Sequence, residues 1–187
     1  MALTATLFSF EIELAHVERG VYETLSFRIA QHPSETPDFL LARVLAYCLE
    51  HADGIQFSAQ GLSGPEEPAL AVRDPTGTLL VWIDIGVPDA ARLHKAAKAA
   101  RRVVVYTHKD PGRLVRMLEG ERVYRLDALE LYAIDREFLA AWAARLTRRT
   151  MASLTVTDGQ LYLTIGDTTL TGAIETIALP RQDKSRG

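Results

Sequence analysis

The stretch TLLVWIDIGVPDAARLHKAAKAARRVVVYT, residues 78–107, decides the fold class of this chain. Its apolar run 79–83 is typical of a central strand that is buried on both faces of a sheet. Pro88 and Asp89 suit the start of a helix, and 103–107 is a second apolar run of strand length. Two strands joined by a helix lie parallel through a right-handed crossover. The stretch therefore predicts an α/β (α+β) domain with a mixed β-sheet and flanking helices.

Additional antiparallel strands are expected at both ends of the chain. Residues 8–14 alternate apolar and polar side chains, and 25–29 repeat the pattern after a short loop, which predicts an antiparallel pair. Near the other end, Asp158-Gly159 joins two alternating segments and favours a two-residue hairpin turn. Residues 169–179 are expected to add one more strand.

A helix is expected to follow the motif HPSETP, residues 32–37. Ser34 or Thr36 suits the N-cap position, and Pro37 is tolerated in the first turn. Apolar residues at helical spacing should form a buried stripe, with polar residues toward the other face. The stripe comprises Leu41, Val44, Leu45, Cys48 and Leu49, and the other face carries Arg43, Tyr47 and Glu50.

With 187 residues, of which 48% are hydrophobic and 24% charged, the chain has the size and composition of one globular domain. We expect residues 1–180 to form this domain and 181–187 to be a flexible tail. The N-terminus lacks the basic start and unbroken apolar segment of a signal peptide, and no segment approaches the roughly 20 apolar residues of a membrane span. A cytoplasmic protein without membrane contact is therefore expected.

The net charge of −3 provides no general attraction for nucleic acid. A nucleic-acid partner would need a local basic patch. Lys98, Arg101 and Arg102 are candidates, although a solvated helix face accounts for them more simply. The single cysteine, Cys48, excludes a disulfide or a cysteine-rich zinc site and fits the helix core as a small apolar residue.

The clearest chemical signal is the pair of acids Glu67 and Asp84. Asp84 follows five apolar residues in a strand expected inside the sheet, where an uncompensated carboxylate is costly. If the turn after Arg73 leads into a hairpin without a bulge, the register places Glu67 opposite Asp84. Directly opposed side chains have Cβ atoms about 5 Å apart, so two like charges there would destabilise the sheet.

Two arrangements would relieve this repulsion. A divalent cation bridging the acids is the first, and carboxylate ligands favour Mg²⁺ or Mn²⁺ over zinc. In the second, Pro68 ends the strand pairing and Glu67 turns to solvent. Asp84 would then form an ion pair with Arg92 or Lys95 on the next helix. The residues alone leave both arrangements open.

Three features together resemble the YaeQ family of bacterial proteins. They are the motif HPSET at 32–36, the segment from Glu67-Pro68 to VWIDIGVPD at 81–89, and the pair Arg92 and Lys95. The similarity extends over nearly the whole chain. It implies a fold similar to the PD-(D/E)xK nuclease superfamily, with a restriction-endonuclease-like core and an acidic site.

The resemblance also implies roles for single residues. Glu67 would match the first acid of the nuclease pattern, Asp84 its D/E position, and Glu35 the acid that a preceding helix supplies. The backbone carbonyl of Ile85 would be a further metal ligand. In a nuclease, Mg²⁺ on Asp84 and Glu67 would polarise the scissile phosphate and activate a water. Glu35 would orient a water or a second metal.

The lysine of the nuclease pattern is missing, because Gly86 stands at its position. A lysine from the following helix would have to replace it. Lys95 is the candidate for holding the nucleophile or the developing charge, and Lys98 is the alternative. Four other residues are candidates for contact with a substrate or for support of the acids: Ser34, Arg43, Arg92 and Tyr106.

Three functions are compatible with these residues. The first is a nuclease or other phosphodiesterase that uses Mg²⁺ or Mn²⁺ to cleave DNA or RNA. The second is a catalytically inert binding protein with a nuclease fold, acting through a protein or nucleic-acid partner, which Gly86 and the acidic net charge favour. The third is a purely structural ion pair between Asp84 and Lys95.

Overall fold

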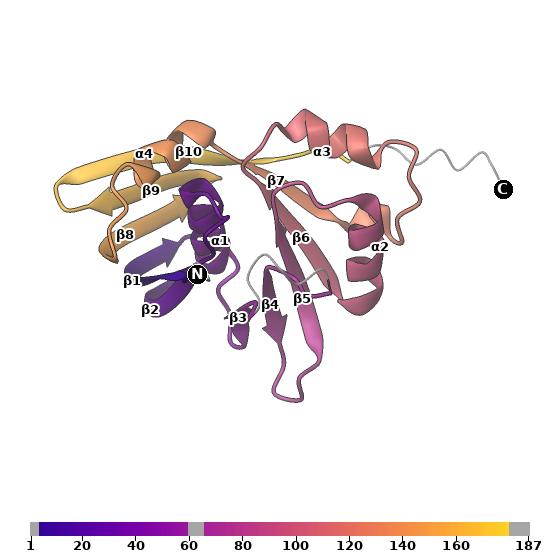
Figure 1. The fold of residues 1–187 in the computed structure, drawn as a ribbon, viewed down its shortest axis with the longest axis horizontal. Coiled ribbons are helices and arrows are strands. Elements are labelled where there is room, and N and C mark those ends of the chain that lie inside the picture. The colour runs from indigo at the N-terminus through magenta and orange to yellow at the C-terminus, as the bar shows by residue number, and fades with distance from the viewer. Residues whose placement is uncertain (1–3, 60–65, 180–187) are drawn as a thin grey trace.

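A ten-stranded β-sheet forms the framework of the protein (Figure 1). The computed structural model describes residues 4–59 and 66–179, so the expected tail at 181–187 lies outside the described residues. The strand order across the sheet is β2-β1-β8-β9-β10-β7-β6-β5-β4-β3. The strands are β1 (Thr6–His16), β2 (Val21–Gln31), β3 (Ile55–Phe57), β4 (Leu70–Arg73), β5 (Leu79–Ile85), β6 (Arg102–Thr107), β7 (Glu130–Ile134), β8 (Arg149–Thr157), β9 (Gln160–Ile165) and β10 (Thr168–Thr176).

The described residues also form four α-helices and a short 3-10 helix. These are α1 (Pro37–Leu49), α2 (Ala90–Ala99), α3 (Pro111–Leu118), α4 (Arg136–Ala143) and η2 (Leu126–Ala128). Of the two expected N-cap candidates, Ser34 and Thr36, it is Thr36 that caps α1, and its hydroxyl accepts a hydrogen bond from the Phe39 backbone N–H at 3.3 Å. Within the described ranges, no helix is both long and apolar enough to span a membrane. The mixed α/β class is confirmed.

The parallel part of the sheet follows the expected strand–helix–strand pattern. Strand β5 pairs in parallel with β6, and β6 pairs in parallel with β7. Helices α2 and α3 cover one face, where Trp82 of β5 and Val105 of β6 pack with Leu93 and Leu114 of the helices. Strands β4 and β3 continue the sheet in antiparallel orientation.

The terminal strands form the other half of the sheet. Strands β1 and β2 pair antiparallel, and β8 and β9 join through Asp158-Gly159, both of which take positive φ. These pairings confirm the predictions. Strand β1 also pairs in parallel with β8, which the sequence did not indicate. Strand β10 links the halves, because residues 168–173 pair with β9 and 174–176 pair with β7 (Figure 1).

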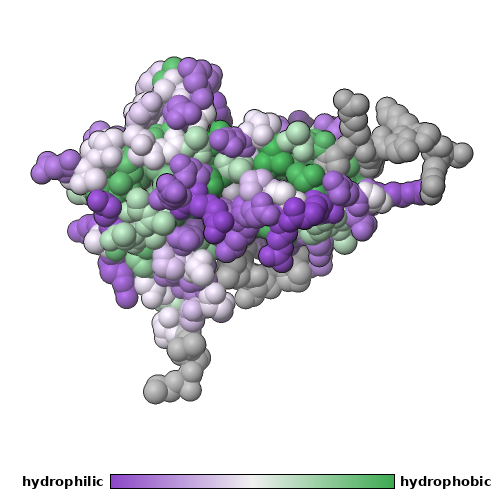
Figure 2. Space-filling model, turned by 90° about the horizontal axis from the view of Figure 1, so that it is seen from above, coloured by the Kyte–Doolittle hydropathy of each residue, from purple (hydrophilic) through white to green (hydrophobic). Residues whose placement is uncertain are grey.

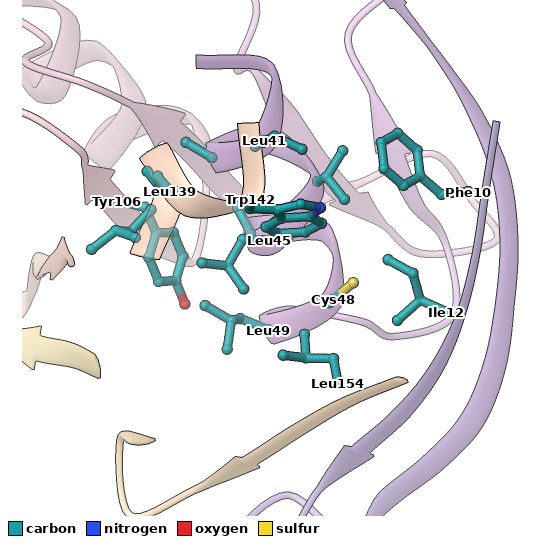
Figure 3. Packing of buried hydrophobic residues seen from close by; sticks show 14 of the residues in the cluster. Phe10, Ile12, Leu41, Leu45, Cys48, Leu49, Tyr106, Leu139, Trp142 and Leu154 are labelled. Atoms are coloured by element: carbon teal, nitrogen blue, oxygen red, sulfur yellow. The ribbon is translucent and has the colours of Figure 1, made fainter. Parts of the chain in front are cut away.

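Helix α1 lies between these two halves and is surrounded by them. Figure 3 shows its side chains between Ile12 and Leu154 of the terminal strands and Trp142 of α4. Because neighbours cover the helix on several sides, almost no part of it faces solvent. Arg43 and Glu50, expected on the face opposite the apolar stripe, are only 3% and 5% exposed. The polar face of α1 is therefore buried as well, because the helix is enclosed.

Candidate functional site

Asp84 lies near the end of β5 and points toward α2. Side chains alternate along a strand, and Trp82 packs with Leu93 of α2. Ile83 and Ile85, which alternate with Trp82, belong to the core around α1. Asp84 therefore shares a face with Trp82, and it is only 2% exposed. A carboxylate at this depth requires compensating donors.

The hairpin before Asp84 contains two features that change its register. A three-residue loop, 75–77, separates Asp74 from Thr78, whose carbonyl accepts from the Asp74 N–H at 3.1 Å. Gly77 takes a φ of +87° in this loop, a conformation that glycine adopts without steric cost. A bulge follows at Leu80, since the register is interrupted there. Each feature moves the pairing by one position.

As a result, Ala69 rather than Glu67 lies beside Asp84. Leu70 pairs with Ile83, and the Ala69 N–H donates to Asp84 Oδ1 at 3.4 Å. The prediction that Glu67 faces Asp84 was therefore wrong. The exposed Glu67 carboxylate instead accepts from the Ser58 hydroxyl at 3.2 Å, as expected if the pairing ends near Pro68. No repulsion between directly opposed acids remains to be relieved.

Arg92, the third residue of α2, compensates the buried Asp84. Its Nε donates to Asp84 Oδ2 at 2.7 Å and its Nη2 donates to Oδ1 at 2.8 Å, the geometry of a bidentate ion pair. Nη2 also donates to the backbone carbonyl of Glu67 at 2.6 Å. The guanidinium lies 5.4 Å from the Trp82 ring, and its hydrogen bonds to Asp84 raise the pKa of Arg92. Of the two partners expected for Asp84, Arg92 and Lys95, Arg92 is the one that binds it.

Lys95 lies one turn further along α2 and pairs with Glu66 rather than with Asp84. The Glu66 side chain is largely exposed and that of Lys95 is partly exposed. Lys98, the alternative candidate, lies in the last turn of the helix. The structural ion pair is thus made by Arg92, and the catalytic role proposed for a lysine stays a prediction.

Glu35 forms a second bidentate pair, with Arg43 of α1. Arg43 donates from Nε to Glu35 Oε1 and from Nη2 to Oε2, both at 2.7 Å. Glu35 Oε2 also accepts from the His32 backbone N–H at 3.0 Å, and Arg43 donates to the Ala30 carbonyl at 2.9 Å. The Ser34 hydroxyl is hydrogen-bonded to the His32 ring at 2.7 Å. Glu35 and Arg43 therefore tie the start of α1 to the end of β2.

The sheet separates the two acids, since Asp84 faces α2 and Glu35 is bound to α1 on the opposite face. Ile85, the expected source of a carbonyl ligand, is paired with Tyr106 of β6. In the described ranges, no three His, Cys, Asp or Glu side chains are close enough together to hold a metal ion. The Mg²⁺ or Mn²⁺ site stays a prediction, and the one buried carboxylate on β5 is held by an arginine.

His108 is a buried polar residue that packs against Phe39 of α1. It follows the end of β6 and is 4% exposed, and neither ring nitrogen has a hydrogen-bond partner in the described part of the chain. The Phe39 ring lies 5.7 Å away, and a Cβ on Gly86 would be 3.9 Å from His108 Cε1. Burial lowers the pKa of His108 to about 4, so the ring is neutral at pH 7.

The edge at which the parallel strands end is therefore polar. It gathers His108, the Asp84–Arg92 pair and the starts of α2, α3 and α4, which follow β5, β6 and β7. Figure 2 looks onto the side of α3 and α4 and shows a band of hydrophilic side chains between hydrophobic ones. Ligands of α/β proteins commonly bind beyond the carboxyl ends of parallel strands. The sequence marks His108 by its position at the end of the second apolar strand, a common location for sites in α/β sheets.

The model of the YaeQ protein family matches residues 1–174. The chain belongs to the YaeQ family. It is 30% identical to the YaeQ protein of Escherichia coli (strain K12) over 165 residues, which cover 87% of this chain and 90% of that one. It is 26% identical to the YaeQ protein of Salmonella typhi over 164 residues, with the same shares of each chain. Both relatives are described as uncharacterised, so the family name carries no activity with it.

Two crystal structures of YaeQ proteins share the fold. The protein from Xanthomonas axonopodis pv. citri has a TM-score of 0.83 and 29% identity, covering 95% of this chain and 100% of that one. The protein from Pseudomonas syringae has a TM-score of 0.82 and 25% identity, covering 95% and 98%. The arrangement of strands and helices is therefore common to these YaeQ proteins.

Tyr106 belongs to a separate polar network at the C-terminal end of α1. Its hydroxyl donates to Glu50 Oε1 at 2.6 Å, and burial raises its pKa well above the usual value. Arg102 donates to Glu50 and, through Nε and Nη2 at 2.7 and 2.6 Å, to Glu130. Tyr106 thus points to the α1 side of the sheet, away from the face that carries Asp84.

Proposed function

We propose that this protein is a nucleic-acid-binding protein with a PD-(D/E)xK-like core that lacks metal-dependent cleavage activity. Three positions support the nuclease-like ancestry of the core. Glu67 precedes β4, Asp84 lies on β5, and Glu35 directly precedes α1. These are the positions that the resemblance implies for the first acid, the D/E residue and the helix acid.

The observation that carries the proposal is the placement of Arg92. Its guanidinium joins both carboxylate oxygens of Asp84 to the carbonyl of Glu67, the two segments that a catalytic cation would bridge. A divalent metal promotes cleavage by polarising the phosphate and lowering the pKa of a bound water. A guanidinium donates hydrogen bonds but cannot ligate a water and turn it into hydroxide. Arg92 therefore stabilises the buried Asp84, but it does not provide an activated water for cleavage.

A local cluster of arginines supports a nucleic-acid partner despite the acidic net charge. Arg28 of β2 and Arg149 of β8 both lie beside Ser9 of β1, so the three form a row across neighbouring strands. Arg148 precedes Arg149, and all three arginines are exposed. In the described part of the chain, none of them forms an ion pair, which leaves their charge available for phosphates.

The test combines binding and cleavage in one series. Labelled single-stranded and duplex DNA and RNA are incubated with the protein in Mg²⁺ and in Mn²⁺, and both retardation and strand length are measured on gels. We expect retardation without cleavage in either metal, and the same retardation with Asp84→Asn. Metal-dependent cutting that Asp84→Asn abolishes would overturn the proposal in favour of a nuclease.

The partner is tested with the arginine row. The double variant Arg28→Gln/Arg149→Gln should weaken binding at 100 mM salt. The plot of log association constant against log salt concentration should also become less steep by about 2, one for each lost phosphate contact. Arg113→Gln, which removes an exposed arginine of α3, serves as the matched control and should bind like the parent. Absence of binding to every nucleic acid would remove the partner assignment.

A further inference from the structure

The outer face of the terminal half of the sheet is open to solvent. Strands β2, β1, β8, β9 and β10 form this half, and their inner side chains, such as Phe10, Ile12 and Leu154, pack around α1 and α4. Side chains at the alternate positions point outward, and Glu11 and Met151 among them are exposed. No described element therefore covers the outer face, and a partner can reach it.

Large apolar side chains gather on this outer face. Six such side chains are exposed in the described ranges of the chain, and four of them occupy outward positions of these strands. These four are Leu7, Tyr22, Met151 and Tyr162, each at least 42% exposed. Single exposed apolar residues are common, but a group of them on one face marks an interaction surface.

Cations lie at one end of the face and an aromatic ring at the other. The arginine row, Arg28 and Arg149 on either side of Ser9, forms the basic end. Six residues further along β8, Thr155 pairs with Tyr162 of β9. This separation is about 20 Å along an extended strand. A ligand that contacts both ends must therefore be elongated as well as anionic.

Hydroxyl groups line the face between these two ends. Ser153 of β8 pairs with Thr164 of β9, whose hydroxyl is hydrogen-bonded to that of Thr169 at 2.8 Å. The acids of this face, Glu11 and Glu13, lie on β1, which is on the other side of β8 from β9. A polyanion that follows β8 and β9 therefore meets hydroxyl groups and passes beside the carboxylates instead of crossing them.

We propose that this face binds single-stranded nucleic acid, with phosphates at the arginine row and a base stacked on Tyr162. Guanidinium groups match the geometry of phosphate oxygens, and an aromatic ring can stack on any unpaired base. A duplex keeps its bases stacked inside, so it could use the arginines but not the tyrosine. The inference rests on the proposed function and deepens it by naming the form of nucleic acid that is bound.

The charges on the face favour a nucleic acid over a second copy of the chain. Charged residues are depleted at the centre of interfaces between proteins. Here Glu11 and Glu13 lie in the middle of the face, between the positions of Arg28 and Tyr22 along the β1–β2 pair. A second copy stacked on the face would bury these carboxylates, whereas a strand that follows β8 and β9 leaves them in solvent.

Fluorescence anisotropy measures the affinity for a labelled single strand and for the duplex of the same sequence. We expect the parent to bind the single strand tighter than the duplex by about fivefold or more, because only an unpaired base can stack on Tyr162. Tyr162→Leu should remove this preference and leave duplex affinity unchanged. Tyr162→Phe keeps the ring and should bind like the parent. Tyr124→Leu, which removes an exposed tyrosine outside these strands, is the matched control.

A photo-crosslink locates the base directly. Single strands that contain 5-iodouracil react with aromatic side chains on irradiation, and the tryptic peptide 150–181 contains Tyr162 as its only aromatic residue. We expect mass spectrometry to find the crosslink in this peptide for the parent and Tyr162→Phe proteins. The Tyr162→Leu protein should lack it.

The outcomes separate this inference from the proposed function. Equal affinity for single strand and duplex, unchanged in Tyr162→Leu, would overturn the stacking site and leave a nucleic-acid-binding protein. The same holds if the bound strand crosslinks only outside peptide 150–181. Absence of binding to every nucleic acid would remove the proposed partner as well. A dimer that Met151→Lys dissociates in sedimentation velocity would assign the face to a second copy and contradict the inference.

Discussion

The two arginine–carboxylate pairs are alike in chemistry and differ in exposure. In each, an acid is bound through two hydrogen bonds by an arginine eight residues later in a helix: Glu35 by Arg43 and Asp84 by Arg92. The side chains of Glu35 and Arg43 are 0% and 4% exposed, whereas that of Arg92 is 24% exposed. The first pair is enclosed by the fold, and the second is open on one side.

This difference determines what each pair can do. Neither solvent nor a ligand reaches the Glu35–Arg43 pair without local opening, so its role is to anchor α1 against β2. Arg92 lies at the surface and connects Asp84 with the backbone of Glu67, so a partner can contact it directly. The enclosed pair, Glu35 and Arg43, thus stabilises the fold, whereas the open pair, Asp84 and Arg92, can also contact a partner.

Removing the enclosed cation should have the largest effect. Arg43→Met leaves the Glu35 carboxylate buried without its partner, so we expect a loss of about 3–5 kcal/mol in the free energy of unfolding, measured by urea denaturation. The double variant Glu35→Gln/Arg43→Met removes both charges and should recover most of the loss. A loss below about 1 kcal/mol for Arg43→Met would show that the enclosed pair contributes no more to stability than the open pair.

The open pair should tolerate the same change better. Arg92→Met exposes Asp84 to a surface that water can reach, so the expected loss is about 2–3 kcal/mol in the same urea experiment. Mn²⁺ should not restore this stability if Asp84 lacks further metal ligands. A loss equal to that of Arg43→Met would show that the difference in exposure has no energetic consequence.

The buried His108 should make stability depend on pH. Its pKa is lowered from 6.5 to about 4 in the folded protein, so the unfolded chain binds the proton more readily. Stability is therefore fully present above about pH 6.5 and falls as the pH decreases toward 4. The charged groups Asp38, Lys109 and Arg136 act on the ring as well.

We expect the parent protein to lose about 1 kcal/mol more than His108→Phe between pH 7 and pH 5, allowing for screening by solvent. Urea denaturation at the two pH values measures the difference. Identical pH dependence in both proteins would mean that the imidazole takes up its proton without cost, and that the site is hydrated.

The smallest effect is expected for the pair nearest the surface, Lys95 and Glu66. Lys95→Ala removes the partner of Glu66, and because exposed ion pairs contribute little, stability should change by no more than about 0.5 kcal/mol. The urea midpoint of this variant is the measurement. A loss comparable with that of Arg92→Met would indicate that Lys95 supports Asp84, the role that the sequence alone allowed.

Much of the fold followed from local patterns. Alternation in β1 and β2 and the Asp158-Gly159 turn were predicted correctly, and the cap of α1 was narrowed to Ser34 or Thr36, because each depends on residues close together in the sequence. The parallel pairing of β5 with β6 was also predicted correctly, because two strands of one sheet that are joined by a helix are normally parallel. The pairing of β1 with β8 was missed because the strands are distant in the chain.

The site was predicted less completely. The sequence identified Asp84 as a buried acid and offered Arg92 among its partners, and the structure contains that pair. It could not exclude a bulge, and one extra residue in the loop and one at Leu80 moved Glu67 away from Asp84. Register depends on small differences between alternative turns and bulges, which apolar patterns do not resolve.

By itself, the sequence determined the main strands and helices, the family and the acid that needs a partner. Only the tertiary structure decided that α1 is enclosed, that Arg43 and Glu50 are buried, and that the sheet separates Glu35 from Asp84. The physical reason is the range of the interactions. Periodicity and capping act over a few residues, whereas enclosure depends on how strands far apart in the chain close around a helix.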